Sequence, residues 1–211
     1  MALFSTSRTD GVVDLSPNGI TKAVFDNITL TRGPWGNPVG SFLFSGSNNS
    51  YVEVENEGEL DTRFSMSVFA WVHPDASATR AGPIYDYGCS MWVFPSTWGL
   101  EIRYAVRDRS KIHRLRKDGI IKINEWNFIG TTYDYQTGVA SVWVNDSMVM
   151  NKSLGSNVEL ATQGNLTIGA SNNSEIKLYG KVSCLQFFAQ ALSLDQIMNI
   201  KTRCNQTGKH V

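Results

Sequence analysis

A run of basic residues stands out between Val106 and Asp118, where the sequence reads VRDRSKIHRLRKD. From Arg103 to Lys122 there are eight Lys or Arg residues against two Asp, in a chain whose formal charges cancel. Clustered guanidinium and ammonium groups bind carboxylates and sulfates, so the segment suggests recognition of a polyanion such as a sulfated polysaccharide. The predicted ligand-binding residues of this basic patch are Arg107, Arg109, Lys111, Arg114, Arg116 and Lys117.

The basic patch has an alternative explanation as the edge of a sheet. Turn residues at 107–110 and 118–119 predict a short strand over 111–117, between strands that read LEIRYAV and IIKIN. Odd-numbered positions of that strand face one way and even-numbered positions the other, so the charges gather only at the two turns. Lys and Arg on exposed edge strands also protect against aggregation. Both explanations predict exposed charge, and both stay open.

A second candidate surface is the aromatic segment PIYDYGCSMWVFPSTWG, which spans residues 83–99. Aromatic rings stack on the C–H faces of sugars, and a carboxylate accepts hydrogen bonds from sugar hydroxyls. The predicted sugar platform consists of Tyr85, Asp86, Tyr87, Trp92 and Trp98. The alternative is that these side chains fill the space between two sheets, because Tyr and Trp are commonly core residues.

Catalytic motifs are missing from the sequence, and no catalytic residue is assigned. There is no G-x-S-x-G elbow, P-loop or H-E-x-x-H motif, and the three His residues, His73, His113 and His210, are scattered. We therefore expect no enzyme. A formal net charge of zero also differs from the strongly basic domains that bind DNA or RNA, so we expect no nucleic-acid partner.

N-linked glycosylation is predicted by N-x-S/T sequons. They begin at Asn27, Asn48, Asn145, Asn151, Asn165, Asn172 and Asn205. So many sequons are typical of a secreted chain or of the extracellular part of a larger protein, although the opening MALFSTSRTDG lacks a signal peptide. An Asn- and Ser-rich surface that produces sequons by accident is the alternative. No run approaches the roughly 20 apolar residues that cross a bilayer, so we expect no membrane insertion.

Cysteine is sparse, with residues at 89, 184 and 204 and no C-x-x-C motif. The segment KVSCLQFF resembles a strand, and the following SLDQIMNIKTRC resembles a helix that can fold back over it. We therefore predict a disulfide between Cys184 and Cys204. Cys89 is then either a free or intermolecular thiol, or a small buried hydrophobic residue.

Apolar and polar residues alternate with period two through most of the chain. SMSVFAWVH places Met66, Val68, Ala70 and Val72 on one face, and residues 125–150 predict three strands joined by turns at 134–138 and 145–146. Helical spacing is convincing only for Leu192, Leu194, Ile197 and Ile200, after the N-cap candidate Ser193. The fold class is therefore all-β, an antiparallel two-sheet sandwich with one short C-terminal helix. We expect a single domain over 1–204 and a tail over 205–211.

The order of these segments resembles a known family. The stretches WNFIGTTYDYQTGVASVWVN and GKVSCLQFFAQALS are similar to those of laminin G-like and pentraxin-like modules in the concanavalin A-like lectin and glucanase superfamily. The resemblance covers nearly the whole chain, and it implies a two-sheet jelly roll and lectin-like binding.

The resemblance also raises the question of a catalytic site and of a calcium site. Related glucanases carry catalytic carboxylates on one strand, and the nearest counterparts here, Glu53, Glu55, Glu57 and Glu59, lack the Glu-x-Asp-x-x-Glu arrangement. Many related modules hold Ca²⁺, which makes the ion possible as a cofactor. However, the sequence has no D-x-D-x-D cluster and no acidic residue at Val182–Cys184, so we name no metal ligand.

Together these patterns predict a non-enzymatic extracellular binding or adhesion module. Its expected ligand is a glycan, including a sulfated polysaccharide bound by the basic patch. The alternative is a module that binds a cell-surface or matrix protein and has no glycan site. A sandwich-type glycosidase is a third reading, which would require catalysis by the glutamate run.

Overall fold

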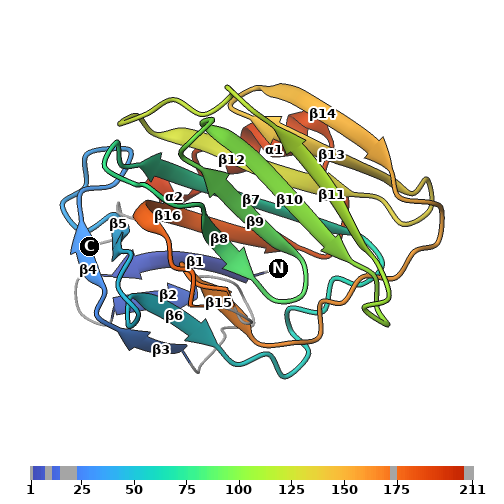
Figure 1. Cartoon of the computed structure of the whole chain (residues 1–211), viewed down its shortest axis with the longest axis horizontal. Helices are drawn as coiled ribbons and strands as arrows, with labels where there is room; N and C mark the ends of the chain where they lie inside the picture. Colours follow the sequence, from blue (N-terminus) through green and yellow to red (C-terminus); the bar gives the residue numbers. More distant parts are fainter. Residues whose placement is uncertain (1, 8–10, 15–22, 172–174, 207–211) are drawn as a thin grey trace.

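The computed structural model describes residues 2–7, 11–14, 23–171 and 175–206. Within these ranges sixteen strands form two antiparallel sheets, and two short helices follow near the C-terminal end. Figure 1 shows the sheets stacked as two layers, with β8 to β11 in the layer nearer the viewer. The predicted all-β, two-sheet antiparallel sandwich is confirmed.

Short strands account for nearly half of the described chain. Their bounds are β1 (Ala2–Ser7), β2 (Gly11–Asp14), β3 (Ala23–Asp26), β4 (Thr29–Thr31), β5 (Ser41–Ser45), β6 (Tyr51–Val54), β7 (Met66–Pro74), β8 (Gly82–Asp86), β9 (Ser90–Phe94), β10 (Gly99–Ala105), β11 (Ile112–Lys117), β12 (Asn127–Tyr133), β13 (Val139–Val144), β14 (Ser147–Ser153), β15 (Leu166–Ile168) and β16 (Tyr179–Phe188). The helices are α1 (Leu194–Ile200) and α2 (Arg203–Gln206).

Strands from distant parts of the chain lie side by side in both sheets. The nine-stranded sheet runs β14-β13-β12-β7-β16-β1-β2, with β5 also beside β16 and β4 beside β5. The seven-stranded sheet runs β11-β10-β9-β8-β15-β6-β3. Consequently β11 is an edge strand, as the sequence predicted for residues 111–117.

The hydrophobic core lies between the two sheets. The predicted face of β7, with Met66, Val68, Ala70 and Val72, is buried there. Tyrosines fill much of the remaining volume: the Tyr87 and Thr62 hydroxyls are 2.8 Å apart, whereas the buried Tyr85 hydroxyl has no hydrogen-bond partner among the described residues. This packing removes large aromatic faces from solvent, which bears on the predicted sugar platform.

Helix α1 covers the outer face of the nine-stranded sheet. Ser193 is its N-cap and forms a capping box with Gln196, which satisfies backbone donors at the helix start. Ile197 and Ile200 are buried against an outward-facing cluster that includes Phe69. Leu194 was expected to share this buried face, but it is 48% exposed because the helix begins at this residue and turns it toward solvent.

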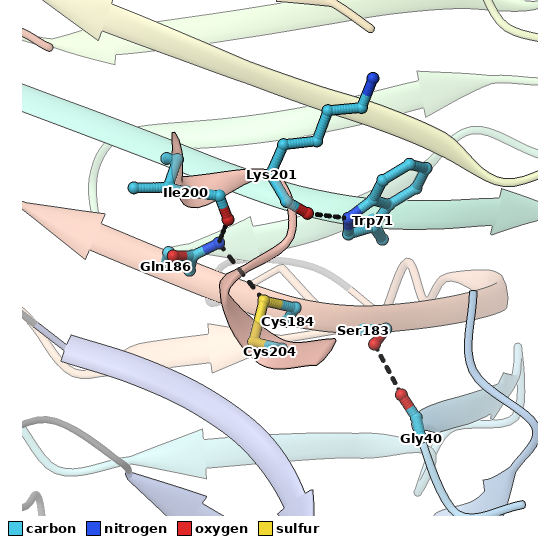
Figure 2. Close-up of a disulfide and its surroundings, with 8 residues drawn as sticks. All are labelled: Gly40, Trp71, Ser183, Cys184, Gln186, Ile200, Lys201 and Cys204. Atoms are coloured by element: carbon cyan, nitrogen blue, oxygen red, sulfur yellow. Dashed lines mark hydrogen bonds between the residues drawn. A yellow bond between two sulfur atoms is a disulfide. The ribbon is translucent and has the colours of Figure 1, made fainter. Parts of the chain in front are cut away.

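A disulfide holds the end of α1 and the start of α2 against strand β16. Cys184 and Cys204 are bonded, which confirms the predicted pair. Figure 2 shows two further contacts beside the bridge: Gln186 Nε2 donates to the Ile200 carbonyl at 3.1 Å, and Trp71 Nε1 donates to the Lys201 carbonyl at 2.9 Å.

The third cysteine, Cys89, is a free thiol buried in the core. Burial disfavours the thiolate and raises the pKa of Cys89 to about 12. The interpretation of Cys89 as a small buried hydrophobic residue is confirmed.

One predicted strand is wrong. Asp118-Gly119 does form a turn, with Gly119 at a φ of 72°, but IIKIN at 120–124 is not a strand. The backbone amides of Ile120 and Ile121 instead donate to the Trp98 carbonyl at 3.2 and 3.1 Å. The chain after the turn therefore crosses the end of β10 and does not pair along β11.

Candidate functional site

Strand alternation places polar side chains on the outer face of the seven-stranded sheet. Ser90 and Trp92 of β9 lie on this face, because Met91 between them belongs to the core. The register of β9 with β10 sets Trp92 opposite Glu101 and Ser90 opposite Arg103. An aromatic ring, a carboxylate and a guanidinium thus become neighbours through pairing alone.

Arg103 is held rigidly on this face. Its guanidinium carbon lies 4.1 Å from the centroid of the Trp92 ring, and its Nε donates to Glu101 Oε1 at 2.6 Å. The Trp92 indole nitrogen donates in turn to Ser90 Oγ at 2.9 Å. Within the described residues the two terminal nitrogens of Arg103 have no hydrogen-bond partner, so this oriented fork can donate to a ligand.

A buried carboxylate lies on the same face, two strands away from Arg103. Asp86 ends β8 and is paired in register with Ser90 of β9. Its Oδ1 accepts from the Gly88 amide at 3.2 Å, and its Oδ2 accepts from Ser171 Oγ at 3.1 Å. These bonds fix the orientation of the carboxylate, whose oxygens can accept more than one hydrogen bond each.

These groups surround a surface depression of about 340 Å³. It is lined by Asp86, Gly88, Ser90, Trp92, Arg103, Ala105, Arg109, Ile112, Ser171 and Ile176. Ile112 and Ile176 are 50% and 41% exposed and supply apolar walls. Apolar walls with a few oriented polar groups are typical of small-ligand sites, and two of the charged lining residues are cationic against one anionic.

Arg109 joins the predicted basic patch to this depression. It lies in the turn between β10 and β11 with a φ of 57°, and its side chain is exposed. No carboxylate, hydroxyl or carbonyl group in the described part of the chain binds its guanidinium. The structure thus brings Arg109 of the basic patch together with Asp86 and Trp92 of the predicted sugar platform, which the sequence treated as separate surfaces.

Three other members of the basic patch are occupied by contacts within the protein. Arg107 binds Glu159 at 2.7 Å beside a different depression. Arg116 packs 3.9 Å from the Phe94 ring centroid and binds Asp118 at 3.0 Å. Lys117 Nζ donates to the Val149 carbonyl at 3.0 Å.

The remaining two members, Lys111 and Arg114, are exposed on and beside the edge strand β11. Arg114 faces outward opposite Arg103, and His113 faces inward. Burial, followed by the nearby Lys111 and Lys152, lowers the pKa of His113, so this residue adds no positive charge near pH 7. Strand β11 therefore carries Arg114 and Arg116 on its outer face, while Lys111 and Lys117 lie at its two ends.

Lysines also cover the backbone at this edge of the sandwich. Lys117 reaches from β11 to β14, and Lys152 of β14 donates to the Arg114 carbonyl at 3.5 Å. These contacts join the edges of the two sheets and leave fewer carbonyls of β11 for pairing with another chain. Of the basic patch, Lys117 thus binds a backbone carbonyl of the edge strand β14.

Most aromatic members of the predicted sugar platform are not surface groups. Tyr85 and Tyr87 are fully buried and make edge-to-face contacts with Phe187 of the opposite sheet, so their assignment as a platform is wrong. They flank the outward-facing Asp86, and alternation sends both inward. Trp92 is only 4% exposed and supports Arg103, while Trp98 packs against the core.

Sequence reasoning did not select several residues of the depression. Arg103 was counted among the basic residues but not assigned to a site, and Ser90, Ser171 and Ile176 were not considered. Alternation in residues 90–94 and 99–105 could have placed Trp92 and Arg103 on one face. Ser171 and Ile176 lie after β15 and outside any strand, so no periodic pattern in the sequence points to them.

Sequons occupy several faces. Asn27, Asn48, Asn151, Asn165 and Asn205 are exposed, Asn145 is half-buried, and Asn172 lies outside the described residues. The structure does not show whether these residues carry glycans, so the glycosylation sites stay predictions. The predicted tail at 205–211 likewise falls mostly outside the described residues, as does His210.

The acidic and metal-ligating side chains do not cluster in the described ranges. No three His, Cys, Asp or Glu side chains gather there as a metal-binding group. In the glutamate run only Glu53 lies in a strand, because β6 ends at Val54. No helix in the described ranges is both long and apolar enough to cross a membrane.

Comparison with known proteins agrees with this architecture. A laminin G family profile, described as the concanavalin A-like lectin/glucanases superfamily, matches residues 45–198. No curated protein sequence matches the chain significantly.

Solved structures with the same architecture are distant in sequence. The ligand binding domain of botulinum neurotoxin serotype D, in complex with N-acetylneuraminic acid, has a TM-score of 0.76 and 15% identity, over 96% of this chain and 50% of that one. The binding domain of Paraclostridial Mosquitocidal Protein 1 has a TM-score of 0.77 and 14% identity, over 95% and 52%. This chain thus spans about half the length of each, and at such identity the likeness concerns the fold.

Proposed function

The chain belongs to the concanavalin A-like lectin/glucanases superfamily, and from this premise we propose that it is a carbohydrate-binding module for an acidic glycan. The proposed site is the depression over β8 to β11. The observation that carries the proposal is the convergence there of Arg103 and Arg109 with Asp86 between exposed apolar walls.

The polar groups of the depression suit a sugar that bears a carboxylate or a sulfate. Arg109 supplies an exposed guanidinium without an internal ion pair, and guanidinium groups bind such oxyanions through two parallel hydrogen bonds. The terminal nitrogens of Arg103 supply a second donor set, already oriented by Trp92 and Glu101. Asp86 and Ser171 then offer acceptors to sugar hydroxyls.

The apolar groups of the depression favour a sugar as the ligand over a small inorganic anion. Ile112 and Ile176 present exposed side chains on the two sides of the charged groups. Sugar rings carry C–H faces that pack on such side chains, whereas a free anion gains nothing from them. The disulfide and the fold are consistent with an extracellular domain, and we propose that the module is secreted and glycosylated.

A substitution at Arg109 tests this proposal. Arg109→Ala is expected to weaken binding of heparin fragments or sialyllactose about tenfold, because it removes a charge-assisted pair. Arg109→Lys should recover only part of the affinity, since a lysine retains the charge without the planar fork. Calorimetric titration across a salt series measures both effects.

Arg107→Ala is the matched control, because Arg107 lies in the same turn but binds Glu159 away from the depression. Its affinity should equal that of the unsubstituted protein. Equal losses of glycan affinity in the Arg107 and Arg109 variants would show that binding depends on general surface charge. Absence of binding to any acidic or neutral glycan would leave the protein-binding alternative.

A further inference from the structure

One sequon lies on the same face as the depression. Asn165-Leu-Thr leads into β15, the strand between β8 and β6 in the seven-stranded sheet. Leu166 and Ile168 belong to the core, and Thr167 is paired in register with Asp86 on one side and Glu53 on the other. The sequon thus begins one strand away from the carboxylate of the proposed site.

The Asn165 side chain is directed to the outer face. Its Nδ2 donates to Glu53 Oε1 at 3.3 Å, and Glu53 alternates with core residues Val52 and Val54 in β6. The Asn165 Oδ1 accepts from the Asn56 amide at 3.3 Å. Asn165 is exposed, so its side-chain amide is accessible for the attachment of a sugar.

The chain next to Asn165 runs beside the mouth of the depression. A methyl group on Gly164 would lie 3.9 Å from Arg109 Nη2 and 3.7 Å from the Tyr87 carbonyl. Neighbouring strands are about 4.8 Å apart, so Asn165 lies within a few strand spacings of Arg109 and Asp86. An N-linked glycan is bulky compared with such a separation.

We propose that Asn165 is a glycosylation site whose glycan covers the depression and limits access to Arg109. In the modification the Asn165 Nδ2 loses one proton and bonds to the anomeric carbon of a diphosphate-linked oligosaccharide, whose bond to the diphosphate oxygen breaks. The covering follows from the placement of Asn165, while its effect on ligand binding rests on the proposed function.

The other described sequons serve as comparisons. Asn151 is exposed on β14 of the opposite sheet, and Asn48 lies in the turn between β5 and β6. Asn145 lies at the β13–β14 turn, where its Oδ1 accepts from the Phe128 amide at 3.2 Å. Asn151→Gln is thus a matched control that removes a glycan from another face.

The test uses protein secreted by a glycosylating eukaryotic cell. Glycopeptide mass spectrometry measures occupancy at Asn165, and phenylglyoxal labelling of Arg109 is compared with that of Arg107 in the same sample. We expect Asn165 to be occupied and Arg109 to be labelled more slowly than in Asn165→Gln. Asn151→Gln should match the unsubstituted protein. Trimming the glycans to one sugar should restore labelling without any substitution.

Binding of sialyllactose or heparin fragments is measured on the same samples, and the covered form should bind about tenfold more weakly. An unoccupied Asn165 beside occupied sequons would overturn the proposal, and so would equal Arg109 labelling with and without its glycan. If labelling is slowed but no form binds an acidic glycan, the covering is supported and the proposed ligand is wrong.

Discussion

Gly88 shapes the floor of the depression at the scale of a single residue. Its φ of +105° is unfavourable for a residue with a side chain, and a methyl group there would lie 1.8 Å from the Ala161 carbonyl oxygen. The Gly88 amide also donates to Asp86. Glycine is therefore required both for the backbone conformation and for the close approach of the 161 segment.

Gly88→Ala should lower the free energy of unfolding by about 3 kcal/mol or more, because conformational strain and overpacking add together. Gly58→Ala is the matched control: its φ is +120°, but no atom lies within 4 Å of the added methyl group. That control should lose only about 1–2 kcal/mol. Urea unfolding measures both, and equal losses would show that the contact with Ala161 is unimportant.

Residue identity alone could not separate surface from core in the aromatic segment. Asp86 does line the depression, as expected of a carboxylate between aromatic residues, and its role in binding stays a prediction. Tyr85 and Tyr87 were wrongly selected, because their ring chemistry suits sugar stacking as well as it suits a core. The alternation of side chains on either side of Asp86 decides which of these residues face the core. The β-bulge between Pro83 and Tyr85 interrupts this alternation, and the bulge cannot be recognised in the sequence.

At the scale of elements, strands and helix were largely predictable because each has its own periodicity. The strands at 127–133, 139–144 and 147–153 follow the expected turns, and α1 begins after its predicted cap. The strand at 120–124 was wrong because tertiary contacts with Trp98 outweigh an apolar run. No local pattern could show that loops bring Arg109 and Ser171 to the same depression.

The disulfide provides an element-scale prediction. The bond closes a loop with a sequence separation of 20 residues, so its removal should cost about 3 kcal/mol of stability. A Cys184→Ser/Cys204→Ser variant should therefore melt at a lower temperature. Trp71 and Gln186 would still hold the helix end through the Lys201 and Ile200 carbonyls.

Reductant separates the effect of the bond from that of the substitutions. It should lower the melting temperature of the unsubstituted protein toward that of the variant, and it should leave the variant unchanged. An unsubstituted protein that is indifferent to reductant would show that the bridge contributes little to stability.

At the scale of the whole molecule, the outer faces of the two sheets differ. Helix α1 and the disulfide cover the nine-stranded sheet, whereas β8 to β11 present a charged depression on the seven-stranded sheet. Formal charges cancel over the chain, so attraction of an acidic ligand depends on their local distribution. The sequence shows that distribution only as a basic run. Half of the basic patch, namely Arg107, Arg116 and Lys117, contacts other groups of the protein.

Photocrosslinking tests whether an acidic glycan binds over β8 to β11. A sialyllactose or heparin-fragment probe with a photoreactive group is irradiated with the unglycosylated protein, and labelled peptides are sequenced by mass spectrometry. We expect labels within residues 86–92 and 103–112 that excess unlabelled glycan removes. Labels confined to the Arg107–Glu159 depression or to the nine-stranded sheet would contradict it.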